Sequence, residues 1–484
     1  IVSVQLLQTT DIHGYCERSD ALETGGGFLR LATLIARERE RFGAERTLLV
    51  DCGDTVQGTL LAQTSRGQAL VDLLDYLNYD VWVPGNHELD YGTDRLSAMC
   101  CGLAPRVLCG NLTLAVGDHS YRPPAWRMFT RGGARIAVIG AQASYLDQWF
   151  WGELYRGFDV ETAHDMLTRV MPTVLANQPD MIVLALHQGW LPRDPRRVNE
   201  VRDLAARFPE IDLMLGGHTH WEHAGRKIGL RTWYVQAGQH ANFLGRIVAV
   251  IDTEKHDVLD IRSRLIVADG DVPVHAGARR AIGSWLAKKR TVAGTRVGRL
   301  AEPLSSYGRP GVDCQASELL CRAIAGAAGA DVVVHGRLSR ADFAAGEFTE
   351  ADLFRLVPYE NGIGVATLTP TQLRLIIQEQ FANRDSYVFC GVWGVNVSVD
   401  ADYQVLELTA RDGGPLPEQL KVAFNSYTLA GGGGRFPVLR SVTRGPEADL
   451  TDTGLATRAV VRRYFQAREA VSVAAREWIR RQRR

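Results

Sequence analysis

The sequence has no excess of either charge, because Lys and Arg together number 55 and Asp and Glu together also number 55. A balanced chain has no overall field that attracts a polyanion, so we expect no binding to nucleic acid polymers. No apolar run approaches the roughly 20 residues that cross a bilayer, so we expect no transmembrane segment. With 484 residues, of which 46% are hydrophobic, the chain is long enough to bury large cores and to form at least two domains.

Cysteine is also scarce, with eight residues in the chain, too few for a fold built on disulfides. No CxxC zinc pattern is present. Three cysteines lie in apolar, strand-like segments, which favours small buried thiols. Two pairs could bridge in an oxidising compartment. The three are Cys52, Cys109 and Cys390, and the pairs are Cys100 with Cys101 and Cys314 with Cys321.

We expect no signal peptide within the numbered chain. It opens with IVSVQLLQTT, which is typical of a strand, and it begins with Ile rather than Met. We therefore expect it to be a processed or shortened form of a longer chain.

Short β-rich runs that end in polar clusters recur through about residue 255, as in VQLLQTTDIHG, RTLLVDCGD and DVWVPGNHE. Segments with apolar residues at helical spacing lie between them, which predicts an α/β domain. A basic, Ala-rich helical segment follows, and the remaining chain mixes helical and strand-like patterns, which predicts an α+β domain. We place the first domain at 1–272, a linker helix at 273–294 and the second domain at 295–484.

Polar side chains follow five predicted strands of the first domain, at the point where each strand ends. Open sheets bind ligands outside the carboxyl ends of their strands. Any one of these residues could instead cap a helix, form a turn or be a satisfied core histidine. Helix capping could explain one such residue, but not five strand ends that each supply an oxygen or imidazole ligand. We therefore expect these residues to form one shared site. Its residues are Asp11 and His13, Asp54, Asn86 with His87, His187, and His218 with His220.

Oxygen and imidazole ligands without a thiolate suit divalent metal ions. Two ions roughly 3.5–4 Å apart can hold both the attacking and the leaving oxygen of a phosphoryl displacement, and they need one carboxylate between them. Asp54 is the natural candidate for that shared ligand. The sequence thus predicts two divalent ions and leaves their identity open among Zn, Mn, Fe, Co and Mg.

The motifs DIHG, GDTVQG, GNHELDYG, HQG and GGHTH resemble those of the calcineurin-like metallophosphoesterases. The ELDYG that follows GNH, together with the second domain, is similar to the 5'-nucleotidase family in particular. The resemblance implies a four-layer αββα sandwich followed by a smaller α+β substrate-binding domain. It also implies a periplasmic or exported location.

The same resemblance implies a role for each strand-end residue. His87 becomes a catalytic residue that stabilises charge developing on the phosphoryl oxygens or the leaving group, and Asp90 orients it. We expect Glu88 to face away, as a structural or solvated residue. The implied ligands are Asp11, His13, Asp54 and His220 for one metal ion and Asp54, Asn86, His187 and His218 for the other.

The second domain resembles the family less closely. PYEN, at 358–361, matches a family turn, whereas HGRLSR replaces most of the small residues of a glycine-rich turn. GGGGRF, at 431–436, lacks an aspartate that contacts the base or ribose in the family, which puts adenine-like recognition in doubt. An Arg is often a surface group and a Phe is often core, so structural roles stay open for these positions. The resemblance implies substrate contacts from Arg340 and Arg384 and a nucleobase sandwich between Phe389 and Tyr427.

The predicted function is a two-metal phosphoester hydrolase that releases phosphate from 5'-nucleotides or related small nucleotide substrates by attack of a metal-bridging hydroxide. One alternative is a 2',3'-cyclic nucleotide phosphodiesterase or a hydrolase of a non-nucleotide ester with the same metals, although Asp90 weighs against the cyclic branch. Another alternative is a binding protein without activity, against which the complete ligand set and His87 argue.

Overall fold

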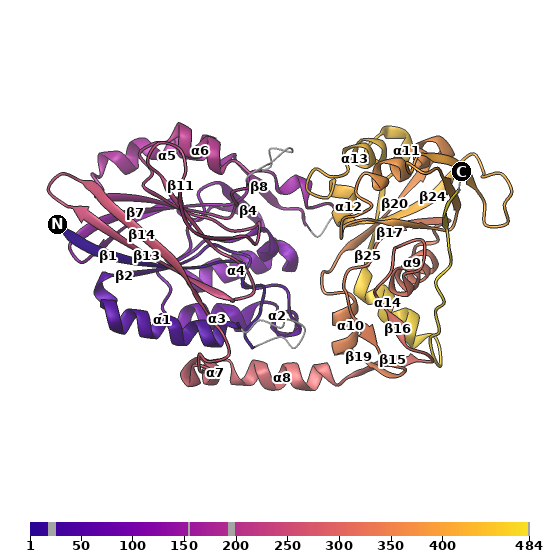
Figure 1. Cartoon of the computed structure of the whole chain (residues 1–484), viewed down its shortest axis with the longest axis horizontal. Helices are drawn as coiled ribbons and strands as arrows, with labels where there is room; N and C mark the ends of the chain where they lie inside the picture. The colour runs from indigo at the N-terminus through magenta and orange to yellow at the C-terminus, as the bar shows by residue number, and fades with distance from the viewer. Residues whose placement is uncertain (18–25, 153–154, 192–198, 483–484) are drawn as a thin grey trace. The chain divides into compact units, whose positions relative to one another are not determined.

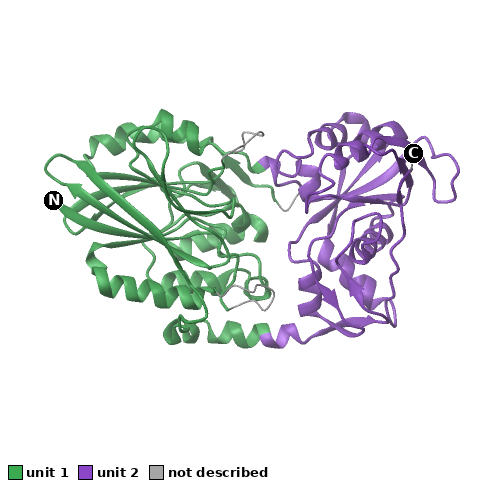
Figure 2. Ribbon diagram, viewed as in Figure 1, with its two compact units in different colours: residues 1–146, 155–289 green, residues 147–154, 290–484 purple. Residues whose placement is uncertain are grey.

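The computed structural model describes residues 1–17, 26–152, 155–191 and 199–482. The chain folds into two compact units, Ile1–Leu146 with Tyr155–Lys289 and Asp147–Leu154 with Arg290–Arg484 (Figure 2). Within the described residues, no helix combines the length and the apolar character needed to cross a membrane. All eight cysteines are free, so neither candidate cysteine pair is bridged.

The first unit contains a five-stranded sheet with the strand order β14-β13-β1-β2-β3. β1 is parallel to β2 and β2 to β3, whereas β13 is antiparallel to both β1 and β14. β1 is buried from Val4 onward because both faces of the sheet are covered. The strands are β1 (Val2–Thr9), β2 (Thr47–Asp51), β3 (Val81–Trp82), β13 (Phe243–Asp252) and β14 (Asp257–Val267).

A second sheet of six strands has the order β11-β12-β10-β9-β7-β6. Its four central strands are parallel, and the two edge strands are antiparallel to their neighbours. The parallel strands bring their carboxyl ends to one edge of the sheet. The strands are β6 (Trp126–Arg131), β7 (Ala134–Ala141), β9 (Met181–Leu186), β10 (Leu213–Leu215), β11 (Glu222–Lys227) and β12 (Trp233–Ala237).

The two sheets pack face to face, with helices on their outer faces (Figure 1). Leu6 and Val50 of the first sheet share a buried core with Val138 and Leu213 of the second. Met166 belongs to another core on the far face of the second sheet. The four-layer αββα sandwich is therefore confirmed. Its helices are α1 (Phe28–Phe42) and α3 (Gln68–Tyr76) beside the first sheet and α5 (Ala163–Ala176) and α6 (Val201–Arg207) beside the second.

Shorter elements complete the first unit. A three-stranded sheet has the order β5-β4-β8. The 3₁₀ helix Asn86–Tyr91 directly follows the short loop after β3 and carries several of the predicted site residues. The other elements are α2 (Leu60–Ser65), α4 (Thr93–Leu103), β4 (Leu112–Val116), β5 (His119–Tyr121) and β8 (Phe158–Val160).

The segment predicted as one linker helix, 273–294, contains two helices instead, α7 (Ala276–Ala281) and α8 (Gly283–Ala293). The break falls at Ile282, whose φ of −104° and ψ of 16° are not helical. Gly283 follows directly, and glycine is a poor helix former. The first unit ends inside α8, at Lys289. The domain boundaries at 272 and 294 stay predictions.

The second unit is built on a five-stranded sheet with the order β21-β17-β24-β20-β25, in which only β17 and β24 are parallel. Helices pack against this sheet around one large apolar core. The sheet and its main helices are β17 (Val332–His335), β20 (Gly362–Leu368), β21 (Gly391–Trp393), β24 (Leu420–Asn425), β25 (Thr451–Ala456), α9 (Gln315–Ala328), α11 (Pro370–Phe381) and α14 (Thr457–Gln466).

Small sheets and short helices surround that core. One sheet has the order β23-β22-β26, and two further pairs are β15 with β19 and β16 with β18. The elements are β15 (Arg296–Leu300), β16 (Leu304–Ser305), β18 (Asp342–Phe343), β19 (Gly346–Thr349), β22 (Asn396–Val399), β23 (Val405–Thr409), β26 (Ile479–Arg481), α10 (Glu350–Leu356), α12 (Ser426–Ala430) and α13 (Pro437–Thr443).

A short segment from the predicted first domain, residues 147–152, belongs to the second unit. The carbonyl oxygen of Gln148 accepts a hydrogen bond from the N–H of Gly433 at 2.9 Å. Trp151 packs against the apolar core of this unit. These contacts explain why the segment groups with the second unit although the first unit flanks it in sequence.

Candidate metal centre

The predicted ligands lie where the strands of the two sheets end. Asp11 and His13 follow β1, and Asp54 follows β2. Asn86 opens the 3₁₀ helix after β3. The second sheet supplies three histidines from the loops that follow β9 and β10, which are parallel neighbours. These three are His187, His218 and His220.

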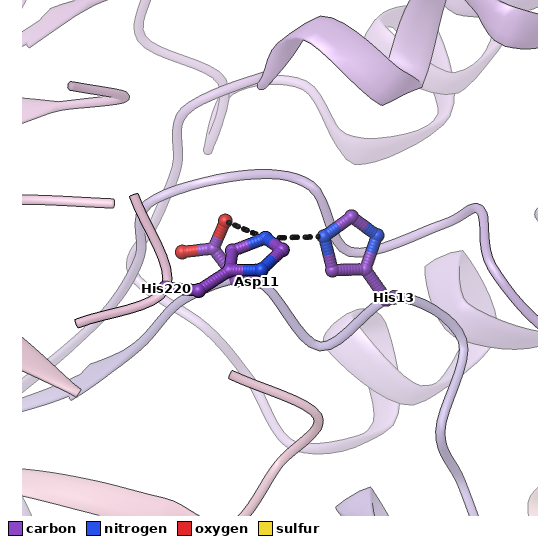
Figure 3. A group of neighbouring side chains, drawn as sticks. All are labelled: Asp11, His13 and His220. Carbon is purple, nitrogen blue, oxygen red and sulfur yellow. Dashed lines mark hydrogen bonds and ion pairs between the residues drawn. The ribbon is translucent and has the colours of Figure 1, made fainter. Parts of the chain in front are cut away.

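One group of potential ligands consists of Asp11, His13 and His220 (Figure 3). Nε2 of His13 lies 3.0 Å from Nε2 of His220, and Nε2 of His220 lies 3.4 Å from Oδ1 of Asp11. Asp11 and His13 are buried, whereas His220 is partly exposed. The three side chains therefore converge on one position, as ligands of a single ion do.

A second group consists of Asp54, His187 and His218, with Asn86 beside them. Nε2 of His187 lies 3.1 Å from Oδ2 of Asp54. Oδ1 of Asn86 lies 3.2 Å from Nε2 of His187 and 2.8 Å from Nδ1 of His218. Two oxygens and two ring nitrogens thus face one another across a short gap.

Asp54 connects the two groups. Its Oδ2 lies 3.1 Å from Nε2 of His187 in one group and 3.8 Å from Nε2 of His13 in the other. The carboxylate is almost fully buried, and its second oxygen accepts a hydrogen bond from the N–H of His87. Its carboxylate therefore lies near ligands of both groups.

The tautomers of two histidines fit metal binding. Nδ1 of His187 lies 2.6 Å from the carbonyl oxygen of Cys52, and Nδ1 of His13 lies 3.2 Å from that of Gln57. A carbonyl oxygen can only accept, so each Nδ1 carries the hydrogen and donates it. In the neutral ring each Nε2 then directs a lone pair at the other ligands, which is the arrangement found around bound metal ions.

Protonation states at the centre follow from burial and charge. Burial raises the pKa of Asp54, but the charges of His187 and then His87 reverse this effect and hold the pKa well below its usual value. Burial lowers the pKa of His218 to about 3, and the charge of His187 adds to the effect. For His187, burial favours the neutral ring, but the charge of Asp54 raises its pKa to about 10. Nε2 of His187 therefore holds a cation beside Asp54, either a proton or a metal ion.

Five of the seven predicted ligands have a left-handed backbone, which residues other than glycine rarely adopt. Such strain persists where the surrounding structure enforces it, and it concentrates at functional sites. The surrounding structure therefore holds these loops in a strained conformation at the candidate ligands. The five residues and their φ values are Asp11 (50°), His13 (49°), Asp54 (53°), His218 (69°) and His220 (61°).

His87 and Asp90 form a hydrogen-bonded ion pair next to the ligands. Nδ1 of His87 lies 2.9 Å from Oδ2 of Asp90. The ring centroid of His87 lies 5.2 Å from that of His13. Burial lowers the pKa of His87, but the charges of Asp90 and Asp54 outweigh it and raise the pKa to about 9. A positively charged ring beside the ligand groups can stabilise negative charge on a reacting group.

Glu88 is a structural residue, as one of the two expectations had it, but it does not face away from the site and is not solvated. Its side chain is fully buried and accepts hydrogen bonds from the N–H groups of Asp54 (2.9 Å), Thr55 (2.7 Å) and Val56 (3.1 Å), and also from that of Gly85. Glu88 therefore holds the loop that carries the shared ligand. No local pattern reports this orientation, because Gly85, three residues earlier, has no side chain with which to complete a capping box.

His240 was also missed by the sequence reasoning. Its backbone has a φ of 57°, and its ring centroid lies 5.8 Å from that of His13 and 6.2 Å from that of His220. It follows β12, the next strand of the second sheet, so its strand-end position was the available signal.

Family models match most of the chain. Residues 4–222 match the model of the calcineurin-like phosphoesterases, and residues 294–441 match that of the C-terminal domain of 5'-nucleotidases. The chain belongs to the calcineurin-like phosphoesterases with a 5'-nucleotidase C-terminal domain.

Solved structures share the whole fold. A putative 5'-nucleotidase from Staphylococcus aureus, in complex with alpha-ketoglutarate, has a TM-score of 0.85 at 18% identity, with 100% of both chains covered. A 5'-nucleotidase precursor from Thermus thermophilus has a TM-score of 0.74 at 21% identity, with 99% of both chains covered.

Curated relatives match parts of the chain. The trifunctional nucleotide phosphoesterase protein YfkN of Bacillus subtilis is 27% identical over 45% of this chain, which spans only 17% of that relative. The 5'-nucleotidase of Bos taurus is 22% identical over 66% of this chain and 59% of its own length.

Three of the four predicted substrate residues lie near one cavity of the second unit. Arg384 and Phe389 line the cavity together with Tyr387. The guanidinium of Arg340 lies 5.9 Å from the ring centroid of Tyr387. Tyr427 is not among the lining residues; its hydroxyl donates to the carbonyl oxygen of Gly432 at 3.2 Å. The structure thus groups the two arginines with Phe389 and leaves Tyr427 outside the cavity lining.

Proposed function

We propose that this chain is a two-metal hydrolase that releases phosphate from 5'-nucleotides or related nucleotide substrates. The position of Asp54 supports this most directly, because its carboxylate lies between two groups of ligands and can serve both. The relatives named as nucleotidases and phosphoesterases agree with this class of substrate.

The residues would divide the work as the sequence predicts. Asp11, His13, Asp54 and His220 would hold one divalent ion. Bound divalent ions lower the pKa of water and polarise phosphoryl oxygens. The second ion would be held by Asp54, Asn86, His187 and His218, and Zn, Mn, Fe, Co and Mg are the candidates for both.

His87 would act on the substrate itself. Its ring is charged at neutral pH because of Asp90 and Asp54, and it lies beside the first group of ligands. It can therefore donate a hydrogen bond to a phosphoryl oxygen or to the leaving oxygen as negative charge develops there. Asp90 would act as a positioning residue. Its carboxylate holds Nδ1 of His87 in a hydrogen bond, so that Nε2 of His87 points away from Asp90.

A second candidate is the hydrolysis of 2',3'-cyclic nucleotides. It is favoured by the relatives named 2',3'-cyclic-nucleotide 2'-phosphodiesterase/3'-nucleotidase, one of which, from Haemophilus influenzae, is 25% identical over 45% of this chain. Asp90 stays the feature that counts against it.

We also propose an exported location, supported by the Thermus thermophilus neighbour described as a precursor.

The test is a substrate panel on metal-stripped chain that is reloaded with one ion type at a time. The panel contains AMP, a 2',3'-cyclic nucleotide, a sugar nucleotide and an aryl phosphate. We expect metal-dependent release of phosphate from AMP, and Asp54→Asn should abolish it. Asp118→Asn is the matched control, because Asp118 is exposed in the turn between β4 and β5. Activity on none of the phosphoesters with any ion would overturn the proposal.

A further inference from the structure

His240 lies at the edge of the first group of ligands without belonging to it. Its ring centroid is 5.8 Å from that of His13 and 6.2 Å from that of His220, and neither group of potential ligands includes it. The ring of Tyr15 packs against that of His240, with centroids 4.2 Å apart and an interplanar angle of 34°. This pair of rings therefore lies next to the metal centre and within the same unit of the chain.

The main chain holds both residues in place. The N–H of His240 donates to the carbonyl oxygen of Asp11 at 2.7 Å, and the N–H of Tyr15 donates to that of Ile12 at 3.0 Å. At the start of α1, the N–H of Phe28 donates to the carbonyl oxygen of Tyr15 at 2.8 Å. Both residues are thus bonded to the segment that carries the ligand Asp11, so their positions relative to the first group are fixed.

The turn that carries His240 is strained. His240 and Ala241 both have a left-handed backbone, with φ values of 57° and 58°, although neither is a glycine. The carbonyl oxygen of Ala241 accepts a hydrogen bond from the N–H of Gly27 at 3.2 Å, which helps to enforce this conformation. Such strain concentrates at functional sites. The fold therefore maintains a strained turn that places an imidazole beside the candidate ligands.

The polar atoms of the two rings are not used by the protein. Neither the ring nitrogens of His240 nor the hydroxyl of Tyr15 has a hydrogen-bond partner among the residues that the structure describes. Both side chains are partly exposed. Histidine and tyrosine side chains that serve only the core usually find partners for these atoms. The polar atoms are therefore available to a molecule bound at the metal centre.

The chemistry of the pair suits a hydroxyl group better than a phosphate. A phosphate oxygen accepts hydrogen bonds, which the charged ring of His87 can supply. His240 has no carboxylate partner among the described residues, in contrast to His87 with Asp90. A neutral imidazole offers one donor and one acceptor, and a tyrosine hydroxyl can also do both. A sugar hydroxyl likewise donates and accepts, so the two sides match.

We propose that His240 and Tyr15 bind a hydroxyl group of the sugar on the leaving group and thereby favour nucleotides over simpler phosphate esters. The identity of the substrate in this inference rests on the proposed function. The sugar of a nucleotide is joined to the phosphate through a single oxygen, so it must lie next to the metal centre when the phosphate is bound there. The contact needs no residue outside the first unit.

The first arm of the test measures kcat/KM on the metal-loaded chain with AMP, 2',3'-dideoxy-AMP and an aryl phosphate. The dideoxy compound keeps the base and the phosphate and lacks both sugar hydroxyls. The wild type should prefer AMP to it by roughly 5–10-fold, the effect of one hydrogen bond. Tyr15→Phe removes only a hydroxyl and His240→Phe keeps an aromatic ring. Each should reduce this preference and leave turnover of the aryl phosphate unchanged.

The second arm measures binding without turnover. Metal-loaded chain is titrated calorimetrically with adenosine and with 2',3'-dideoxyadenosine. Adenosine should bind roughly 5–10-fold tighter, and Tyr15→Phe and His240→Phe should reduce the difference. Tyr76→Phe in α3 and His119→Phe in β5 are the matched controls, because both residues are exposed in the same unit. The controls should keep the wild-type preference, and all four variants should keep the wild-type metal content.

The outcomes separate this inference from the proposed function. Equal kcat/KM for AMP and its dideoxy analogue in the wild type, or equal losses on both in Tyr15→Phe and His240→Phe, would overturn the inference. Loss of bound metal in His240→Phe would make His240 a ligand and would also overturn it.

Hydrolysis of none of the phosphoesters would contradict the proposed function, and the nucleoside titration would then decide the inference alone. A preference for adenosine that Tyr15→Phe reduces would support the inference. Equal binding of the two nucleosides, or binding of neither, would overturn it.

Discussion

The backbone N–H of His87 donates a 2.7 Å hydrogen bond to Oδ1 of Asp54. The proposed substrate-contacting residue is thereby tied to the proposed shared ligand through its main chain rather than its ring. His87→Ala keeps this N–H, so both metal ions should stay bound. Turnover should fall by roughly 10²–10³-fold, the effect of removing one group that stabilises the transition state. Steady-state kinetics and metal analysis of the same sample check this.

His119→Ala provides the matched control for His87→Ala, because His119 is an exposed histidine of the same unit in β5. It should change neither turnover nor metal content. If His87→Ala loses a metal ion together with its activity, His87 is a ligand and the assignment of its ring to the substrate is wrong.

The buried carboxylate of Glu88 should increase the affinity for metal ions without binding them itself. It accepts backbone hydrogen bonds from Asp54, Thr55 and Val56. In Glu88→Gln one oxygen becomes an NH₂ group, which faces those N–H donors and cannot accept from them. The loop should loosen and metal affinity should fall by roughly 10–100-fold, as for other residues that support metal ligands.

Chelator competition measures the metal affinity of Glu88→Gln. Glu45→Gln is the control, because the side chain of Glu45 is 72% exposed in the same unit. Unchanged affinity in Glu88→Gln would show that the loop holds Asp54 without this carboxylate.

Phe389 should act through stability rather than stacking. It is 3% exposed and packs in the apolar core of the second unit, so Phe389→Ala should cost about 3–5 kcal/mol of unfolding free energy. Nucleotide and aryl phosphate activities should fall together as the folded population falls. Tyr387→Ala, at an exposed ring, should leave the midpoint of chemical unfolding nearly unchanged. Selective loss of nucleotide turnover in a fully stable Phe389→Ala variant would restore the stacking role that the sequence suggested.

His335 should make the stability of the chain sensitive to mild acid. It is fully buried at the end of β17, and burial lowers its pKa from 6.5 to about 4. In the unfolded chain this histidine binds a proton below about pH 6.5, whereas in the folded chain it binds one only below about pH 4. The free energy of unfolding therefore falls as the pH falls through this window.

Denaturant unfolding at pH 7 and pH 5 measures the effect of His335. Wild-type protein should lose about 2 kcal/mol more between these two pH values than His335→Gln does. His119→Gln should keep the wild-type dependence. Equal losses in wild type and His335→Gln would mean that the imidazole titrates normally inside the fold.

The grouping of the candidate metal ligands was predictable from the sequence because it depends on local rules. Asp54 and His187 each follow the end of a strand, and this local position alone places them at the edge of a sheet. The four layers were implied by the family resemblance that these motifs carry.

The remaining features depend on three-dimensional packing that no local pattern reports. Glu88 turns inward because the 3₁₀ helix directs it at the loop after β2, and the motif alone is equally compatible with a solvated side chain. Phe389 is buried because α11 brings Phe381 against it. The contact between the rings of Tyr15 and His240 joins segments that are far apart in the chain.

The measurement that tests the central claim most directly is the metal content of active protein set against its rate of nucleotide hydrolysis. Metal-stripped chain is titrated with Mn²⁺ or Zn²⁺, and bound metal and phosphate release from AMP are followed together. We expect full activity only when two ions are bound per chain, and we expect Asp54→Asn to lose activity at every metal concentration because one carboxylate serves both ions. Full activity with one ion or none, or an Asp54→Asn variant that hydrolyses AMP at the wild-type rate, would contradict the account.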